Sequence, residues 1–301
     1  MNRYSIYVKR TRITSLLKAF GRVQKSHKVK LAKYKLITNI VTLLYLLFCL
    51  CYFSSVIIVL CIDEYESENW FEDLTFHSNI AVSLPIKVSF NIAYIVLTRL
   101  FRVVSPLFLT AFYIHWCLIL NRLTKQCAEE LRISVQTSNK KRIVHNFIRN
   151  YNKLHGLAVM TESALSVEIF WLMASHFTIV FGMLSKVLGF FGYIDIILDL
   201  ENSVFATIDC ISFFAIIFFA SRIHREDEKV RDQVREVIFQ LSLAKDSTES
   251  SKLLLRFIQS KRQLVLTAGG IFEFTKSFLF TSAGVLITYN LLILQLNTPS
   301  L

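Results

Sequence analysis

The sequence SVFATIDCISFFAIIFFA, residues 203–220, continues without any glycine or proline into SRIHREDEKVRDQVREVIFQL, residues 221–241. The first part has one charged residue, Asp209, whereas the second part is dense in acids and bases. An apolar helix of about 20 residues crosses the hydrocarbon core of a membrane. The stretch therefore predicts a transmembrane helix that leaves the membrane and continues as a charged helix.

Four further apolar regions surround this stretch, at residues 37–61, 80–120, 163–188 and 277–296. Over the whole chain of 301 residues, 53% are hydrophobic and 19% are charged, whereas soluble domains have about 25% charged residues. Only 8 glycines and 3 prolines are present, which disfavours a β-barrel rich in turns. We therefore predict an all-α multi-pass membrane protein.

The connections between the apolar regions differ sharply in charge. Residues 1–36 carry eleven Lys or Arg and no acid, whereas residues 62–79 carry six acids and no base. Bases also exceed acids in residues 121–160 and 221–262, whereas residues 190–202 have acids only. Because loops rich in Lys and Arg stay in the cytoplasm, the N-terminus is predicted to be cytoplasmic and the C-terminus extracellular.

This orientation requires region 80–120 to cross the membrane an odd number of times. We predict one crossing, centred on residues 104–120 and preceded by a helix at 80–100, which gives five spans in total. A hairpin at Arg99–Arg102 would give six spans, but it would place the basic segment 121–160 outside. The expected organisation is a cytoplasmic segment 1–36, a membrane bundle 37–220 with its connection 121–160, a helical anchor region 221–270, a last span 271–296 and an extracellular tail 297–301.

Sequence motifs of the common enzyme and nucleotide-binding classes are absent: there is no Walker A run, GxGxxG, HExxH, CxxC or GxSxG. The seven histidines do not group at the spacing of metal ligands. The net charge of +12 is explained by membrane orientation and attraction to anionic lipid. We therefore expect no catalysis, no metal, no organic cofactor and no nucleic-acid partner.

The last third of the chain carries a recognisable pattern. The charged helical linker 221–262 precedes LVLTAGGIFEFTKSFLF, and the final span contains Thr288, Tyr289 and Gln295. This region resembles the C-terminal part of the insect gustatory receptor family, whose final span has Thr-Tyr, five mostly apolar residues and Gln-Phe. Leu296 stands in the place of the Phe. The resemblance covers about residues 108–296, and the five spans resemble the last five of the family's seven, so that the first two are expected to be missing here.

The resemblance implies a ligand-gated cation channel, assembled as a tetramer of identical or related subunits with the last span beside a central pore. In that arrangement Leu292, Gln295 and Leu296 form one stripe of the helix, because residues three and four apart share a face. Leu292 and Leu296 are expected to form an apolar gate, and Gln295 to offer a dipole to a partly hydrated cation. The alternative for this stripe is a seam that packs against another helix.

The outer half of the bundle holds the candidate residues for a small-molecule tastant. Asp209 is costly inside a span, so it is expected to face a cavity or a partner. Lys186 is the candidate partner, and Phe177, Phe181 and Tyr94 are candidates for apolar contact with a ligand. Packing inside the bundle is the alternative for each of these residues.

Two further features lie near the cytoplasmic surface. Gly269 and Gly270 are expected to break or bend the chain before the last span. Val230, Val234, Val237, Ile238 and Leu241 form an apolar stripe on the charged helix. The resemblance implies that this region gathers the subunits around the pore, whereas the alternative is a helix that folds back on its own subunit. The competing function is a non-channel membrane protein of the same fold that serves in assembly or trafficking.

Overall fold

The computed structural model describes residues 84–99, 102, 104–135, 140–187, 196–243 and 248–297, with residues 11, 14–16 and 18. These residues form helices α4 (Leu84–Arg99), α5 (Ser105–Val135), α6 (Lys140–Val187), α7 (Ile196–Leu243), α8 (Thr248–Ser260) and α9 (Lys276–Asn297). A short antiparallel pair, β1 (Thr267–Ala268) and β2 (Phe272–Glu273), precedes α9. The predicted first span, 37–61, lies outside the described residues, as do the segments 20–36 and 62–79.

Four of the described helices are long and apolar enough to cross a membrane. The candidate spans are residues 105–132, 144–186, 203–242 and 276–295, and each covers all or nearly all of one of the predicted spans. The helix expected at residues 80–100 is present as α4. The all-helical multi-pass architecture predicted from the sequence is therefore confirmed.

Helices α6 and α7 are each 48 residues long, so each extends for about 72 Å at 1.5 Å per residue. The hydrocarbon core of a bilayer is only about 30 Å thick, so more than half of each helix extends beyond it. The charged segment that follows Ala220 continues α7 without a break. The helix predicted to leave the membrane as one continuous element is thus observed.

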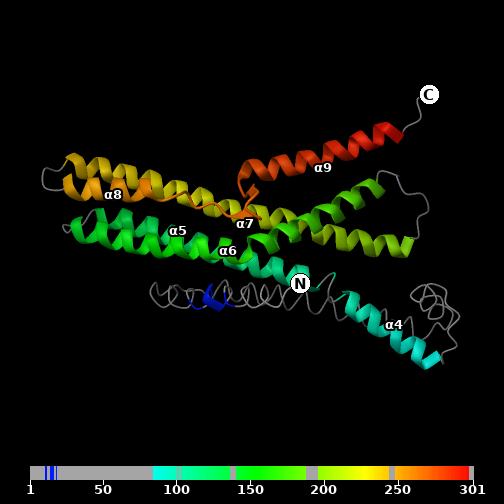
Figure 1. The fold of residues 1–301 in the computed structure, drawn as a ribbon. Coiled ribbons are helices and arrows are strands. Elements are labelled where there is room, and N and C mark those ends of the chain that lie inside the picture. Colours follow the sequence, from blue (N-terminus) through cyan, green and yellow to red (C-terminus); the bar gives the residue numbers. More distant parts are fainter. Residues whose placement is uncertain are drawn as a thin grey trace. The chain divides into compact units, whose positions relative to one another are not determined.

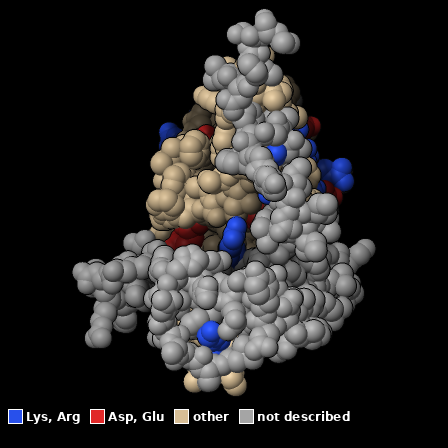
Figure 2. Space-filling view, turned by 90° about the vertical axis from the view of Figure 1, so that its right-hand side faces the viewer, with Lys and Arg blue, Asp and Glu red and all other residues tan. Residues whose placement is uncertain are grey.

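The chain divides into two compact units, residues 30–112 and residues 1–29 with 113–301. In the second unit, α8 runs back alongside the C-terminal part of α7, and the end of α5 lies beside the start of α6 (Figure 1). Figure 2 views the right-hand side of Figure 1, and most of the described surface there is uncharged, with small groups of acidic and basic atoms.

The helical ends away from α9 enclose one hydrophobic core. It is built from α5, α6, α7 and α8, and its buried members are Leu131, Val144, Phe147, Tyr151, Val230, Val234, Val237, Leu241, Leu254 and Ile258. Four of the five predicted stripe residues are fully buried here and Ile238 is partly buried. The stripe therefore packs inside this chain, whereas Phe239 of α7 and Leu253 of α8 are exposed.

The expected break at the paired glycines is a tight turn between β1 and β2. Gly269 and Gly270 have φ angles of 64° and 72°. Residues other than glycine adopt such angles only at a cost in free energy. The chain thereby reverses, and Thr267 pairs with Glu273 across the turn. As a result α9 begins at Lys276, so residues 271–275 of the predicted last segment belong to this hairpin and its exit.

Candidate pore face and ligand site

One face of α9 is attached to its own subunit. Ser282, Leu286 and Asn290 recur every four residues and are buried, as expected for one stripe of a helix. Ser185 on α6 donates its hydroxyl proton to Oδ1 of Asn290 at 2.8 Å, and Nδ2 of Asn290 donates to the carbonyl of Leu286 at 2.8 Å. A polar residue inside an apolar span therefore fixes which side of α9 faces the subunit.

The predicted pore residues lie on the other side of the same helix. Thr288, Leu292 and Gln295 share a face at spacings of four and three residues, and all three are exposed in the single chain. The side chain of Leu292 is 49% exposed, compared with 4% for Leu286. Tyr289 is also exposed, at 56%, and the side chain of Leu296 is outside the described atoms.

Asp209 has a partner that the sequence analysis did not identify. Nδ1 of His176 on α6 lies 2.7 Å from Oδ1 of Asp209 on α7, and the two side chains are 1% and 16% exposed. Lys186 lies ten residues beyond His176 on α6, about 15 Å along the axis, so the suggested pairing of Asp209 with Lys186 is not the one in the structure.

The two candidate phenylalanines follow His176 on the same helix. Phe177 stacks on Phe181 one turn further along α6, with ring centroids 6.4 Å apart and planes at 12°. Phe177 also contacts Phe213 of α7, at 5.9 Å between centroids. The α6–α7 pair thus places an aromatic cluster one residue from a buried His–Asp pair, whereas Tyr94 lies on α4 in the other unit and is exposed.

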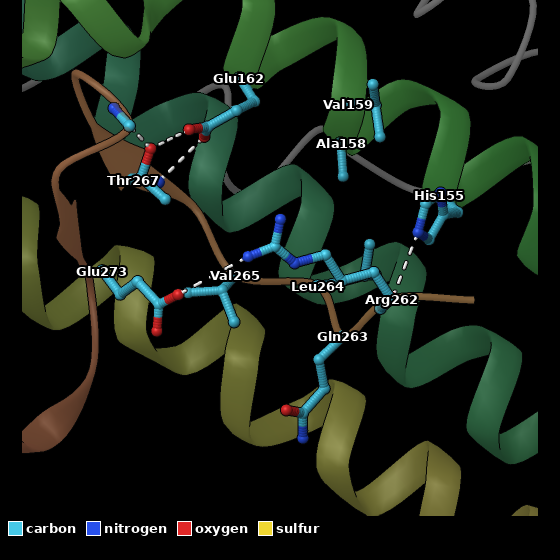
Figure 3. A pocket seen from close by; sticks show the side chains of 11 residues that line it. His155, Ala158, Val159, Glu162, Arg262, Gln263, Leu264, Val265, Thr267 and Glu273 are labelled. Atoms are coloured by element: carbon cyan, nitrogen blue, oxygen red, sulfur yellow. Dashed lines mark hydrogen bonds and ion pairs between the residues drawn. The ribbon is translucent and has the colours of Figure 1, made fainter. Parts of the chain in front are cut away.

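A pocket of about 260 Å³ opens between α6 and the segment that joins α8 to α9 (Figure 3). Its polar walls include Glu162 of α6, which accepts hydrogen bonds from Thr267, and Arg262, which lies 4.0 Å from Glu273. His155 contacts the carbonyl of Arg262 at 3.2 Å. The sequence did not point to Glu162, because its contact with Thr267 joins residues 105 positions apart.

A buried charged network holds the other end of the same segment. Asp227 is fully buried and accepts hydrogen bonds from the hydroxyl of Tyr151 at 2.6 Å, from Nε of Arg231 at 2.9 Å and from the backbone N–H of Leu264 at 3.0 Å. The Arg231 guanidinium also donates to the carbonyls of Ile258, Lys261 and Arg262. These bonds hold the segment that follows α8 against α6 and α7.

Comparison with known proteins shows which family this chain belongs to. The sequence profile of the 7tm chemosensory receptor family matches residues 2–296, nearly the whole chain. The chain therefore belongs to the insect chemosensory receptors, and the match extends over residues 2–107, where the resemblance in the sequence had faded.

The fold resembles that of the insect olfactory receptor OR5 from Machilis hrabei, solved in complex with eugenol. The two structures share 16% sequence identity with a TM-score of 0.55, over 88% of this chain and 70% of that chain. Among curated proteins, no sequence matches this chain.

Proposed function

We propose that this protein is a gustatory receptor that acts as a subunit of a ligand-gated cation channel in the plasma membrane. In this proposal four identical or related subunits surround one pore, and α9 of each subunit stands beside it. The N-terminus lies in the cytoplasm and the C-terminus outside the cell. A small tastant shifts the equilibrium from the closed to the open state by binding the open state more tightly.

The exposed face of α9 is the observation that carries this proposal. Asn290 and Leu286 turn one side of the helix toward its own subunit, which leaves Thr288, Leu292 and Gln295 without cover from that side. A face that combines a hydroxyl, a leucine and an amide is suited to a narrow pore, in which an apolar ring closes by losing its water and a polar ring contacts the ion.

The gustatory assignment rests on the motif residues Thr288, Tyr289 and Gln295. Leu296, in place of the family's phenylalanine, leaves an olfactory co-receptor as the nearest competing assignment within the same family. Neither assignment needs a catalytic group, a metal or an organic cofactor.

The outer half of the α6–α7 pair is the proposed ligand site. His176 and Asp209 supply a polar contact, and Phe177 and Phe181 supply an apolar and aromatic surface. Lys186 remains a candidate for the same site from the sequence, and Tyr94 remains a candidate for apolar contact with a ligand. A tastant with a hydrogen-bonding group attached to an apolar body fits this combination of side chains.

Expression in oocytes, with current recorded over a panel of tastants, tests the channel proposal. Replacing Gln295 with Glu adds a carboxylate to the proposed pore and should raise the permeability of divalent cations relative to sodium, while Gln295→Ala should alter selectivity without that increase. Ser282→Ala is the control, because Ser282 lies on the buried face of α9. Robust currents that are unchanged by substitutions at both Gln295 and Leu292 would reject the pore assignment.

The alternative function is a non-channel membrane protein of this fold that serves in assembly or trafficking. It predicts that the protein reaches the plasma membrane together with related receptors but adds no current of its own. The same oocyte recordings separate the two functions when the chain is expressed alone and with a related subunit.

A further inference from the structure

The hairpin that precedes α9 is docked on one face of α6. Glu162, Ser166 and Phe170 recur every four residues along α6, so they point the same way, and each contacts the hairpin through Thr267, Gly269 or Phe272. We name this set of contacts the hairpin latch. It lies at the end of α9 opposite to the proposed pore residues Leu292 and Gln295.

The carboxylate of Glu162 is the strongest part of the latch. Its Oε2 accepts the backbone N–H of Thr267 at 2.9 Å, and its Oε1 accepts the hydroxyl proton of the same residue (Figure 3). The Thr267 hydroxyl in turn accepts the N–H of Gly270 at 3.1 Å. Both carboxyl oxygens act as acceptors, and hydrogen bonds to a carboxylate are stronger than those between neutral groups.

Two further contacts hold the turn against α6. The N–H of Gly269 donates to the carbonyl of Ser166 at 2.8 Å, a carbonyl inside the helix. Phe272 stacks on Phe170, with centroids 6.2 Å apart and planes at 9°. A Cβ atom on Gly269 would lie 3.2 Å from the Phe170 side chain, so a side chain there would have to displace Phe170 by a few tenths of an ångström.

The latch and the Ser185–Asn290 hydrogen bond tie both ends of α9 to the same helix. Between these ends, α6 also carries His176, Phe177 and Phe181 of the proposed ligand site. A displacement of α6 would therefore reach the start of α9 through the hairpin, without passing through α8.

We propose that the Glu162–Thr267 contact positions the inner end of α9, so that movement of α6 changes the closed–open equilibrium of the pore. Glu162 and Thr267 are thus positioning residues, since they act through α9 rather than on the ion or the tastant. This inference rests on the proposed channel function, because it assigns the latch a role in opening.

Three substitutions separate this role from general packing. Glu162→Gln keeps the shape of the side chain but removes its charge and turns one acceptor into an NH₂ donor, so the Thr267 hydroxyl can no longer donate to that atom. Thr267→Val keeps the shape and removes the hydroxyl, whereas Thr267→Ser keeps both hydrogen bonds. Glu273→Gln is the matched control, because it removes a half-exposed carboxylate of the same hairpin whose ion-pair distance to Arg262 is 4.0 Å.

Hydrogen exchange on the full-length protein in nanodiscs measures the latch without any ligand. We expect Glu162→Gln and Thr267→Val to speed exchange in residues 266–272 and in the first two turns of α9 by about tenfold, since each loses a charge-assisted hydrogen bond. Thr267→Ser and Glu273→Gln should stay within about twofold of the parent. Thr267→Val decides the result if Glu162→Gln fails to fold.

Current in oocytes, normalised to the amount of protein at the cell surface, then measures coupling to the pore. We expect the two disrupting variants to change both the unliganded current and the half-maximal concentration of an activating tastant by about tenfold, and the two controls to leave both unchanged. Unchanged exchange, or faster exchange confined to residues 266–272 with unchanged current, would overturn the inference. If the parent and all variants carry no current, the channel proposal fails, and the exchange of α9 still decides whether the latch positions that helix.

Discussion

Gly269 and Gly270 are neighbours with nearly the same backbone conformation but different surroundings. Both have positive φ angles, of 64° and 72°. A Cβ atom on Gly270 meets nothing within 4 Å, whereas one on Gly269 lies 3.2 Å from the Phe170 side chain. The two positions therefore separate the cost of backbone strain from the cost of steric crowding.

We expect Gly270→Ala to destabilise the protein by about 1 kcal/mol, the cost of a left-handed backbone for a residue with a Cβ atom. Gly269→Ala should cost about 2–4 kcal/mol, since overpacking against Phe170 adds to the same strain. Thermal unfolding of the purified protein in detergent measures both values. Equal losses of stability for Gly269→Ala and Gly270→Ala would contradict the close approach of the turn to α6.

Asp227 and Asp232 form a second matched pair, on the same helix. Asp227 is fully buried among Tyr151, Arg231 and the N–H of Leu264, whereas Asp232 is 70% exposed in its ion pair with Arg235. We expect Asp227→Ala to cost about 3–5 kcal/mol, because it leaves the guanidinium of Arg231 without its counter-charge. Asp232→Ala should cost less than about 1 kcal/mol.

The amount of folded protein at the cell surface and the unfolding temperature in detergent check this second comparison. Tyr151→Phe gives an intermediate case, since it removes one hydroxyl that donates to Asp227 and accepts from Arg231. A loss of stability for Asp232→Ala as large as that for Asp227→Ala would show that the buried network does not hold the segment after α8.

Single residues were predicted from the sequence only where their type is unusual for their place. Asp209 was identified because an acid inside a span is rare. Its partner His176 and the polar residue Asn290 were not, since one histidine or one asparagine in an apolar stretch does not indicate what it faces. The His176–Asp209 hydrogen bond joins residues 33 positions apart, and the Ser185–Asn290 bond joins residues 105 positions apart. Only the packed helices bring these groups together.

At the scale of elements, the long apolar and amphipathic patterns were sufficient to locate the helices. The stripe Val230–Leu241 was predicted from its spacing of three and four residues and is buried in the core of α5 to α8. The hairpin was predicted only as a break at two glycines, because a pair of two-residue strands has no periodicity of its own. Its geometry depends on Glu162 and Phe170, which lie about a hundred residues earlier in the chain.

The attachment of α9 to α6 leads to a prediction about this pair of helices. Ser185→Ala and Asn290→Ala each remove the hydrogen bond between them, so a double-mutant cycle should give a coupling energy of about 0.6–1.7 kcal/mol, the range for hydrogen bonds between helices in membranes. Ser282→Ala is the control, because the Ser282 hydroxyl bonds only to the carbonyl of Leu279 in its own helix among the contacts described. Unfolding in mixed micelles measures the four stabilities of the cycle. A coupling energy near zero would show that the Ser185–Asn290 hydrogen bond does not hold α9 to α6.

At the scale of the whole molecule, α9 has the least cover of the four candidate spans. Within the most apolar 18-residue window of each helix, 17% of α9 is buried inside the chain, compared with 50% for α5. In a membrane such a helix contacts lipid, water or another subunit. The proposed tetramer gives the exposed face of α9 a water-filled path and a neighbouring copy of the same helix.

Cysteine cross-linking distinguishes these environments. Leu292→Cys places a thiol on the exposed face, whereas Leu286→Cys places one on the buried face of the same helix, less than two turns away. Around a central pore, oxidation should join two subunits through Cys at position 292, so that dimers appear on a non-reducing gel. The parent protein and Leu286→Cys, treated in the same way, should remain at their background level because the native cysteines are common to all three. If Leu292→Cys gives only the background amount of cross-linked dimer although the protein has the size of a tetramer, this face of α9 lies against lipid rather than beside a shared axis.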